Sequence, residues 1–107
     1  MSEINIIGSD VGRSFTANVG DSVNVELEEN LSTGYSWESA TSSSLILSLT
    51  ETKHDQPPQS AAGAPGMRSF RFVATSRGAA TIDLKLRRPW DPPGVAAQTF
   101  SVHVEVR

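Results

Sequence analysis

The sequence TIDLKLR, residues 81–87, alternates apolar and polar side chains at every position and decides the fold class. Ile82, Leu84 and Leu86 fall on one side of this segment, and its charged and hydroxyl side chains fall on the other. Successive side chains of a β-strand point to opposite faces, whereas an α-helix repeats its apolar face every three to four residues. The segment is therefore predicted to be a strand with one buried face and one solvated face.

Alternation of the same kind recurs along the chain and predicts further strands. The expected apolar rows are Val23, Val25 and Leu27; Phe70, Phe72 and Ala74; and Phe100, Val102, Val104 and Val106. Two more strand candidates are the segment in which Tyr35, Trp37 and Ser39 alternate with Ser36 and Glu38, and the segment with Leu45, Leu47 and Leu49, which runs to about Lys53. Short strands are also expected near residues 4–7 and 14–19, and no helix is expected. About seven strands joined by turn residues predict an all-β, immunoglobulin-like antiparallel β-sandwich, with a barrel as the alternative.

The composition limits the classes of protein to which the chain can belong. With 107 residues it is expected to form a single domain over residues 1–107. The net charge is -3 and the basic residues are scattered apart from Arg87 and Arg88, so nucleic acid is not an expected partner. Cysteine is absent, which excludes disulfides and thiol chemistry. The N-terminal residues resemble neither a signal peptide nor a membrane span, and both a cytoplasmic protein and an exported mature form fit.

Residues suited to catalysis are few. His54, at the edge of a Pro-rich loop, and His103, on the outward face of the last strand, are both expected to be ordinary surface residues. Glu26, Glu28 and Glu29 could bind a cation, but a solvated charged strand is the favoured interpretation. The sequence contains no metal-binding His spacing and no nucleophile motif. We therefore expect no enzyme activity, no cofactor and no metal.

Turn-rich loops between the strands are the better candidates for function, since recognition often lies on loops held by a rigid frame. Two long loops are expected, from His54 to Pro65 and from Pro89 to Ala97. The candidate binding residues form three groups: Asn30, Leu31, Ser32, Thr33, Gly34 and Tyr35; Gly63, Ala64, Pro65 and Gly66; and Arg88, Pro89 and Trp90. In the first group, Gly34 is suited to a positive φ at the loop tip, although a simple inter-strand turn has the same composition.

Trp90 lies in a Pro-rich loop just beyond a strand, where a small sandwich has little room to bury it. Trp and Arg are the residue types most enriched at energetically dominant contact points, and Pro89 stiffens the loop that presents them. We expect an exposed anchor for a partner; the alternative is that Trp90 folds back as a lid on the core.

Taken together and in this order, the three loops resemble those of the chagasin family, small β-sandwich inhibitors of papain-like cysteine peptidases. Members carry Asn-Pro-Thr-Thr-Gly-Tyr, Gly-x-Gly-Gly and Arg-Pro-Trp loops. Here the third loop matches fully, whereas Leu31 replaces the Pro of the first loop and Ala64-Pro65 interrupt the glycines of the second.

The resemblance implies a non-covalent competitive inhibitor that is a monomer when free and wedges its three loops into the cleft of a papain-like cysteine peptidase. Leu31 to Thr33 would lie over the catalytic residues of the peptidase, with Trp90 and the segment from Gly63 to Gly66 on either side. An immunoglobulin-like adhesion or carbohydrate-binding module, with Tyr35 and Trp90 stacking on a ligand, is the alternative function.

Overall fold

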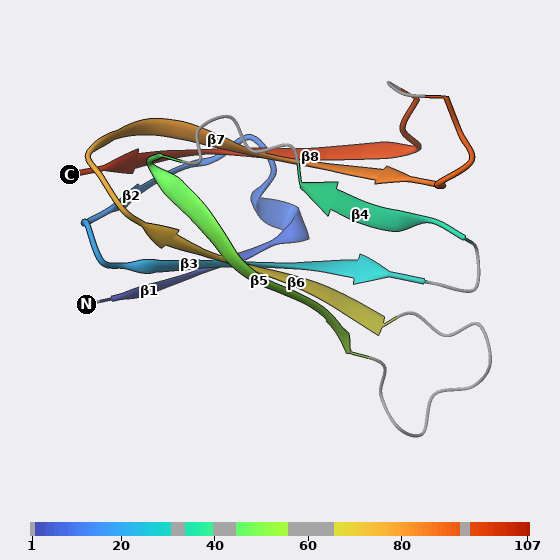
Figure 1. The fold of residues 1–107 in the computed structure, drawn as a ribbon, viewed down its shortest axis with the longest axis horizontal. Helices are drawn as coiled ribbons and strands as arrows, with labels where there is room; N and C mark the ends of the chain where they lie inside the picture. The colour runs from blue at the N-terminus through green and yellow to red at the C-terminus, as the bar shows by residue number, and fades with distance from the viewer. Residues whose placement is uncertain (1, 31–33, 40–44, 56–65, 93–94) are drawn as a thin grey trace.

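The computed structural model describes residues 2–30, 34–39, 45–55, 66–92 and 95–107. These residues form eight strands and one short 3-10 turn, η1 at Gly8–Asp10 (Figure 1). The strands are β1 (Glu3–Ile7), β2 (Ser14–Ala17), β3 (Ser22–Glu29), β4 (Ser36–Ser39), β5 (Leu47–Asp55), β6 (Gly66–Ala74), β7 (Gly78–Arg87) and β8 (Gln98–Val106). The all-β prediction is confirmed, with eight strands where the sequence suggested about seven.

Two four-stranded sheets pack face to face, as the two layers in Figure 1 show. One sheet has the order β1-β3-β6-β5 and the other the order β2-β8-β7-β4. Most neighbours are antiparallel, but β1 pairs with β3, and β2 with β8, in parallel. The sandwich is therefore not antiparallel throughout. The chain passes from β1 through η1 to β2 in the other sheet before it returns to β3, so β1 and β3 are neighbours that run in the same direction.

The core lies between the sheets and is built from the alternating rows of the long strands. Its buried residues are Ile6, Ala17, Val23, Val25, Leu27, Trp37, Leu47, Phe70, Phe72, Ala74, Ala80, Ile82, Leu84, Phe100, Val102, Val104 and Val106. The rows predicted on β3, β6 and β8 are all present. On β7, Ile82 and Leu84 are buried, while Leu86 is half-buried against the core.

The two other predicted segments do form strands, β4 and β5, but each buries only one side chain of its alternating row. Leu45 lies before β5 with 81% of its surface exposed, and Leu49 is 42% exposed, so only Leu47 of that row enters the core. Tyr35 lies ahead of β4 and Ser39 is exposed, which leaves Trp37 as the one buried side chain of its row. Both rows belong to edge strands, where one flank of the strand lacks a neighbour and burial is incomplete.

A β-bulge in β5 reverses the alternation of that strand. Its pairing with β6 shifts between Leu49 and Glu51, so Leu49 lies opposite Phe72 and Thr52 lies opposite Phe70. One extra residue in a strand moves every later side chain to the other face. His54, opposite Arg68, consequently lies on the core-facing side of the sheet.

The strand directions bring all of the candidate loops to one end of the sandwich. In Figure 1 the last residues of β3, β5 and β7 and the first residues of β4, β6 and β8 lie at the right-hand end. Both chain termini lie at the opposite end. We call the right-hand end, from which the stems of residues 30–35, 56–65 and 88–97 emerge, the loop end.

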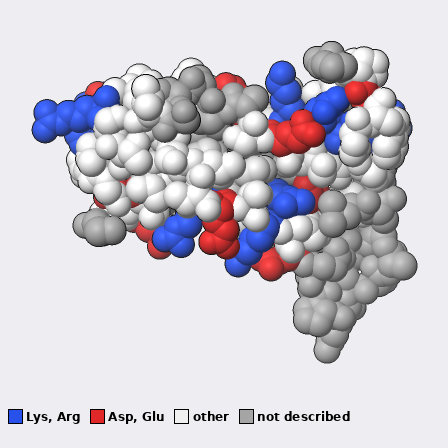
Figure 2. Space-filling view, viewed as in Figure 1, with Lys and Arg blue, Asp and Glu red and all other residues white. Residues whose placement is uncertain are grey.

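Charged side chains of both signs are mixed on the face shown in Figure 2. Basic groups lie beside acidic groups there, with uncharged surface between them. Within the described part of the chain, no helix is both long enough and apolar enough to cross a membrane.

Candidate functional site

The loop that follows β7 is closed by a salt bridge between Arg88 and Asp91. The Nε and Nη2 atoms of Arg88 each donate to an Asp91 carboxylate oxygen at 3.1 Å, and the Asp91 amide donates to the Arg88 carbonyl at 3.1 Å. These bonds hold the pKa of Asp91 below its usual value and raise the pKa of Arg88. Arg87 adds a bond from Nη2 to the Asp91 carbonyl oxygen at 2.8 Å, so residues 88–91 at the start of this loop are braced.

Arg88 also joins the loop after β7 to the loop before β4. Its guanidinium carbon lies 5.0 Å from the centre of the Tyr35 ring and 5.5 Å from the centre of the Trp90 ring. Both distances are within the range of a cation–π interaction. Arg88 therefore contacts both aromatic rings and links Tyr35 to Trp90.

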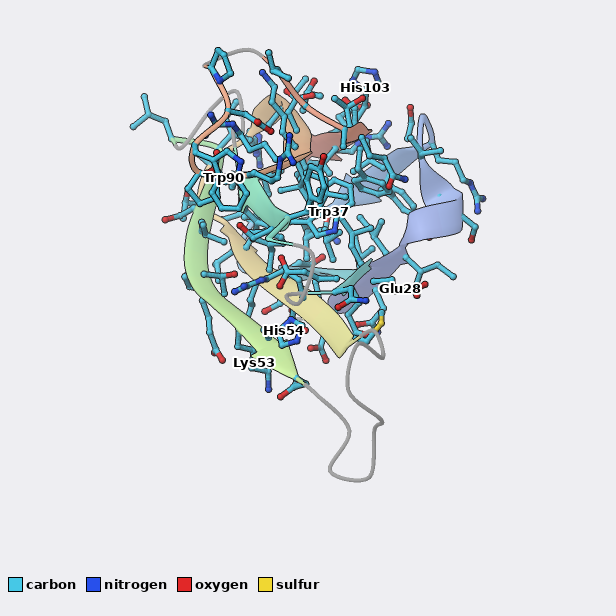
Figure 3. All side chains as sticks on the ribbon, turned by 90° about the vertical axis from the view of Figure 1, so that its right-hand side faces the viewer. Glu28, Trp37, Lys53, His54, Trp90 and His103 are labelled. Carbon is cyan, nitrogen blue, oxygen red and sulfur yellow. The ribbon has the colours of Figure 1, made fainter. Side chains whose placement is uncertain are left out.

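Trp90 lies at the loop end (Figure 3) and is 68% exposed. Its indole lies against the backbone of Gly34. A Cβ atom built on Gly34 would be 2.6 Å from Cη2 of Trp90, closer than real Cβ contacts allow. Gly34 also has φ of 83°, a left-handed conformation that favours glycine. The expectation of a positive φ at Gly34 is thus confirmed, and so is the exposure of Trp90.

Beneath these loops lies a buried carboxylate that the sequence did not predict. The side chain of Glu29 is fully buried, and its Oε2 accepts a hydrogen bond from the Trp37 amide at 2.7 Å. Oε1 lies 2.9 Å from Arg68 Nε and 2.7 Å from His54 Nδ1. Burial alone would raise the pKa of Glu29, but the hydrogen bonds from Arg68, Trp37 and His54 outweigh it and lower that pKa.

This cluster corrects three expectations. Glu29 does not belong to a solvated strand face; it continues the inward row of Val23, Val25 and Leu27. His54 is not a surface residue of a loop, since β5 runs on to Asp55 and the bulge turns His54 inward. Gly66 is not part of the second loop but is the buried first residue of β6, where a Cβ would overlap the Asp55 carbonyl oxygen and lie 2.6 Å from His54 Nε2.

The described candidate residues are placed as follows. Asn30 ends the first stem, Gly34 and Tyr35 are half-buried beside Arg88 and Trp90, and Pro89 is exposed between them. Leu31, Ser32, Thr33, Gly63, Ala64 and Pro65 lie outside the described residues. His103 lies on the outer face of β8, as predicted. The described residues contain no group of three His, Asp or Glu side chains able to hold a metal ion.

Comparison with known proteins finds matches to peptidase inhibitors over most of the chain. Residues 16–104 match the model of the family described as chagasin family peptidase inhibitor I42. Chagasin from Trypanosoma cruzi is 30% identical over 98 residues, which cover 88% of this chain and 89% of chagasin.

Two solved structures share the fold. The cysteine protease inhibitor EhICP2 from Entamoeba histolytica superposes with a TM-score of 0.87 at 21% identity, over 100% of this chain and 97% of that protein. PbICP-C, solved in complex with falcipain-2, has a TM-score of 0.68 at 19% identity, over 100% of each chain.

The β-sandwich presents a braced aromatic and arginine cluster at one end, an arrangement suited to binding a protein partner. The chain belongs to the chagasin family of peptidase inhibitors, and it is therefore an inhibitor and not an enzyme.

Proposed function

We propose that the loop end binds the active-site cleft of a papain-like cysteine peptidase and blocks it without forming a covalent bond. The observation that carries this proposal is the cluster of Tyr35, Arg88 and Trp90, which presents an exposed indole on a braced loop. Family membership supports the class of target.

The physical basis is preorganisation. The salt bridge from Arg88 to Asp91 and the contact of Trp90 with Gly34 fix the aromatic surface before a partner arrives. Less conformational entropy is then lost on binding, and more of the contact energy remains as affinity. Residues 31–33 and 63–65, which are outside the described part of the chain, are proposed from the family resemblance to take part in the same contact surface. No catalytic group on the inhibitor is required.

The test is a titration of the purified chain against papain and a cathepsin L-type peptidase with a fluorogenic peptide substrate. Saturable, competitive inhibition of both enzymes is expected, with no effect on a serine peptidase used as the control. Full peptidase activity at micromolar concentrations of the chain would contradict the proposal.

A further inference from the structure

We propose that the buried carboxylate of Glu29 is a positioning group that sets the first two binding loops relative to each other. The inference rests on the proposed function, because it assigns Glu29 a role in inhibition although the residue is buried away from any partner. Glu29 would act through the stems of the loops and would not touch the peptidase.

One carboxylate oxygen closes the stem of the first loop. Glu29 is the last residue of β3 and directly precedes Asn30, whereas Trp37 is the second residue of β4 on the far side of the loop. The bond of 2.7 Å from the Trp37 amide to Oε2 therefore joins both ends of the segment 30–35. The Trp37 indole adds a bond of 3.0 Å from Nε1 to the Glu28 carbonyl oxygen at the same stem.

The other oxygen joins the stem of the second loop. His54 is the next-to-last residue of β5 and Arg68 is the third residue of β6, so these two side chains flank the segment 56–65. Both contact Oε1 of Glu29, at 2.7 Å and 2.9 Å. Figure 3 looks onto the loop end and shows His54 and Trp37 there, on different strands. A single side chain thus connects four strand ends and two loops.

The chemistry of the site requires a carboxylate. The partners of Glu29 are an amide N–H, a guanidinium and an imidazole nitrogen. An ionised carboxylate only accepts hydrogen bonds, so His54 Nδ1 carries the proton that points to it. A glutamine would place its NH₂ group against the Trp37 amide or against Arg68 and His54, and it would leave the partly buried Arg68 guanidinium without its counter-charge.

A buried ion pair adds little stability compared with well-packed apolar side chains, but it requires a defined geometry. An apolar side chain at Glu29 could fill the space, yet it would not fix the Trp37 amide and the Arg68 guanidinium at set distances from each other. The carboxylate bonds to the strand ends that flank both loops, so it can set the distance between the two loop stems.

The experiment compares Glu29→Gln with Glu28→Gln, whose side chain is exposed on the same strand. Inhibition constants against papain and amide NMR spectra are measured at a temperature where circular dichroism shows each variant folded. Glu29→Gln is expected to raise the inhibition constant by about tenfold or more and to move the amide signals of Gly34, Tyr35 and Gly66 while leaving those of β2 in place. Glu28→Gln should do neither. A folded Glu29→Gln protein with wild-type inhibition, or with unmoved loop-stem signals, would overturn the inference.

A second pair of variants decides the matter if Glu29→Gln does not fold. His54→Leu removes one partner and keeps the bonds from Arg68 and Trp37, and His103→Leu changes an exposed histidine on β8. A higher inhibition constant for His54→Leu alone supports the inference, and equal constants refute it. If the wild-type chain does not inhibit papain, the proposed function fails, while the NMR comparison still tests whether Glu29 sets the loop stems.

Discussion

Trp90 combines 68% exposure with a fixed orientation, which is an unusual state for a large aromatic side chain in a small protein. We expect Trp90→Ala to weaken peptidase binding by about 2 kcal/mol, or about 30-fold, with little change in melting temperature. Leu45→Ala is the control, because Leu45 is 81% exposed and lies before the start of β5, away from the loop end. Equal inhibition by the Trp90→Ala and wild-type proteins would remove Trp90 from the binding surface.

Gly34 packs against the Trp90 indole, and we expect no side chain to be tolerated at this position. Gly34→Ala places a Cβ 2.6 Å from the indole and requires a φ of 83° that alanine adopts at a cost. The variant should displace the indole, shift its fluorescence emission and weaken inhibition. Gly12→Ala is the matched control, since Gly12 has a φ of 81° with no atom within 4 Å of the added Cβ. Similar emission and inhibition in the two variants would mean that a Cβ on Gly34 does not displace the Trp90 indole.

Glu29 gives the free energy of unfolding a defined pH dependence. Its folded-state pKa is below the usual 4.5, so its stabilising effect is fully present above that value and is lost as the pH falls through the folded pKa. The glutamine of the Glu29→Gln variant does not titrate, and the free energy of unfolding of this variant should be about 3 kcal/mol lower than that of the wild type near pH 7. Urea titrations should show a constant difference above about pH 5 and a narrowing one below about pH 4. A difference that is the same at every pH would mean that the carboxylate charge is unimportant.

At the scale of elements, the start of β6 passes so close to the end of β5 that only glycine fits. A Cβ on Gly66 would overlap the Asp55 carbonyl oxygen and lie 2.6 Å from His54 Nε2. Gly66→Ala should lower the free energy of unfolding by about 1–3 kcal/mol, the usual cost of overpacking. In Gly8→Ala the new Cβ would be 3.6 Å from Leu27 Cδ2, an ordinary contact, so this control should change stability by less than about 0.5 kcal/mol. Chemical denaturation measures both.

The elements that the sequence predicted well are the long central strands. β3, β6, β7 and β8 have neighbours on both sides, so burial of one face imposes strict alternation on the sequence. β5 is an edge strand with a bulge, and no residue type in Leu49-Thr50-Glu51 marks the extra residue. The reversal that turns His54 to the core-facing side of the sheet could not be read from the sequence for this reason.

The candidate site also has features that the sequence predicted and features that it did not. The exposed Trp90 and the positive φ of Gly34 follow from local residue types, and both were predicted. The cluster around Glu29 depends on contacts between residues as far apart as Glu29 and Arg68, which local patterns do not report. One feature of the sequence did point to this cluster. Glu29 falls at the same alternate positions as Val23, Val25 and Leu27, and an acidic residue on the inward face of a strand implies a buried partner.

At the scale of the whole molecule, a second buried carboxylate stabilises the end opposite the loops. Asp21 precedes β3 and accepts hydrogen bonds from the Asn18 amide at 2.9 Å and the Ser2 amide at 2.8 Å, which lower its pKa. Asp21→Ala should reduce the melting temperature and leave the inhibition constant unchanged while the protein is folded. Trp90→Ala should show the reverse pattern. A raised inhibition constant in folded Asp21→Ala would mean that the two ends are energetically coupled.

The position of both termini at the end away from the loops has a practical consequence for tethering. A chain attached to a solid support through Arg107 would hold its loops outward, toward the solution. Two copies joined by a flexible linker at their termini would both keep their loop ends away from the linker, so each copy could bind a separate peptidase. The same arrangement allows a fluorescent reporter to be fused at either terminus without crowding the loops.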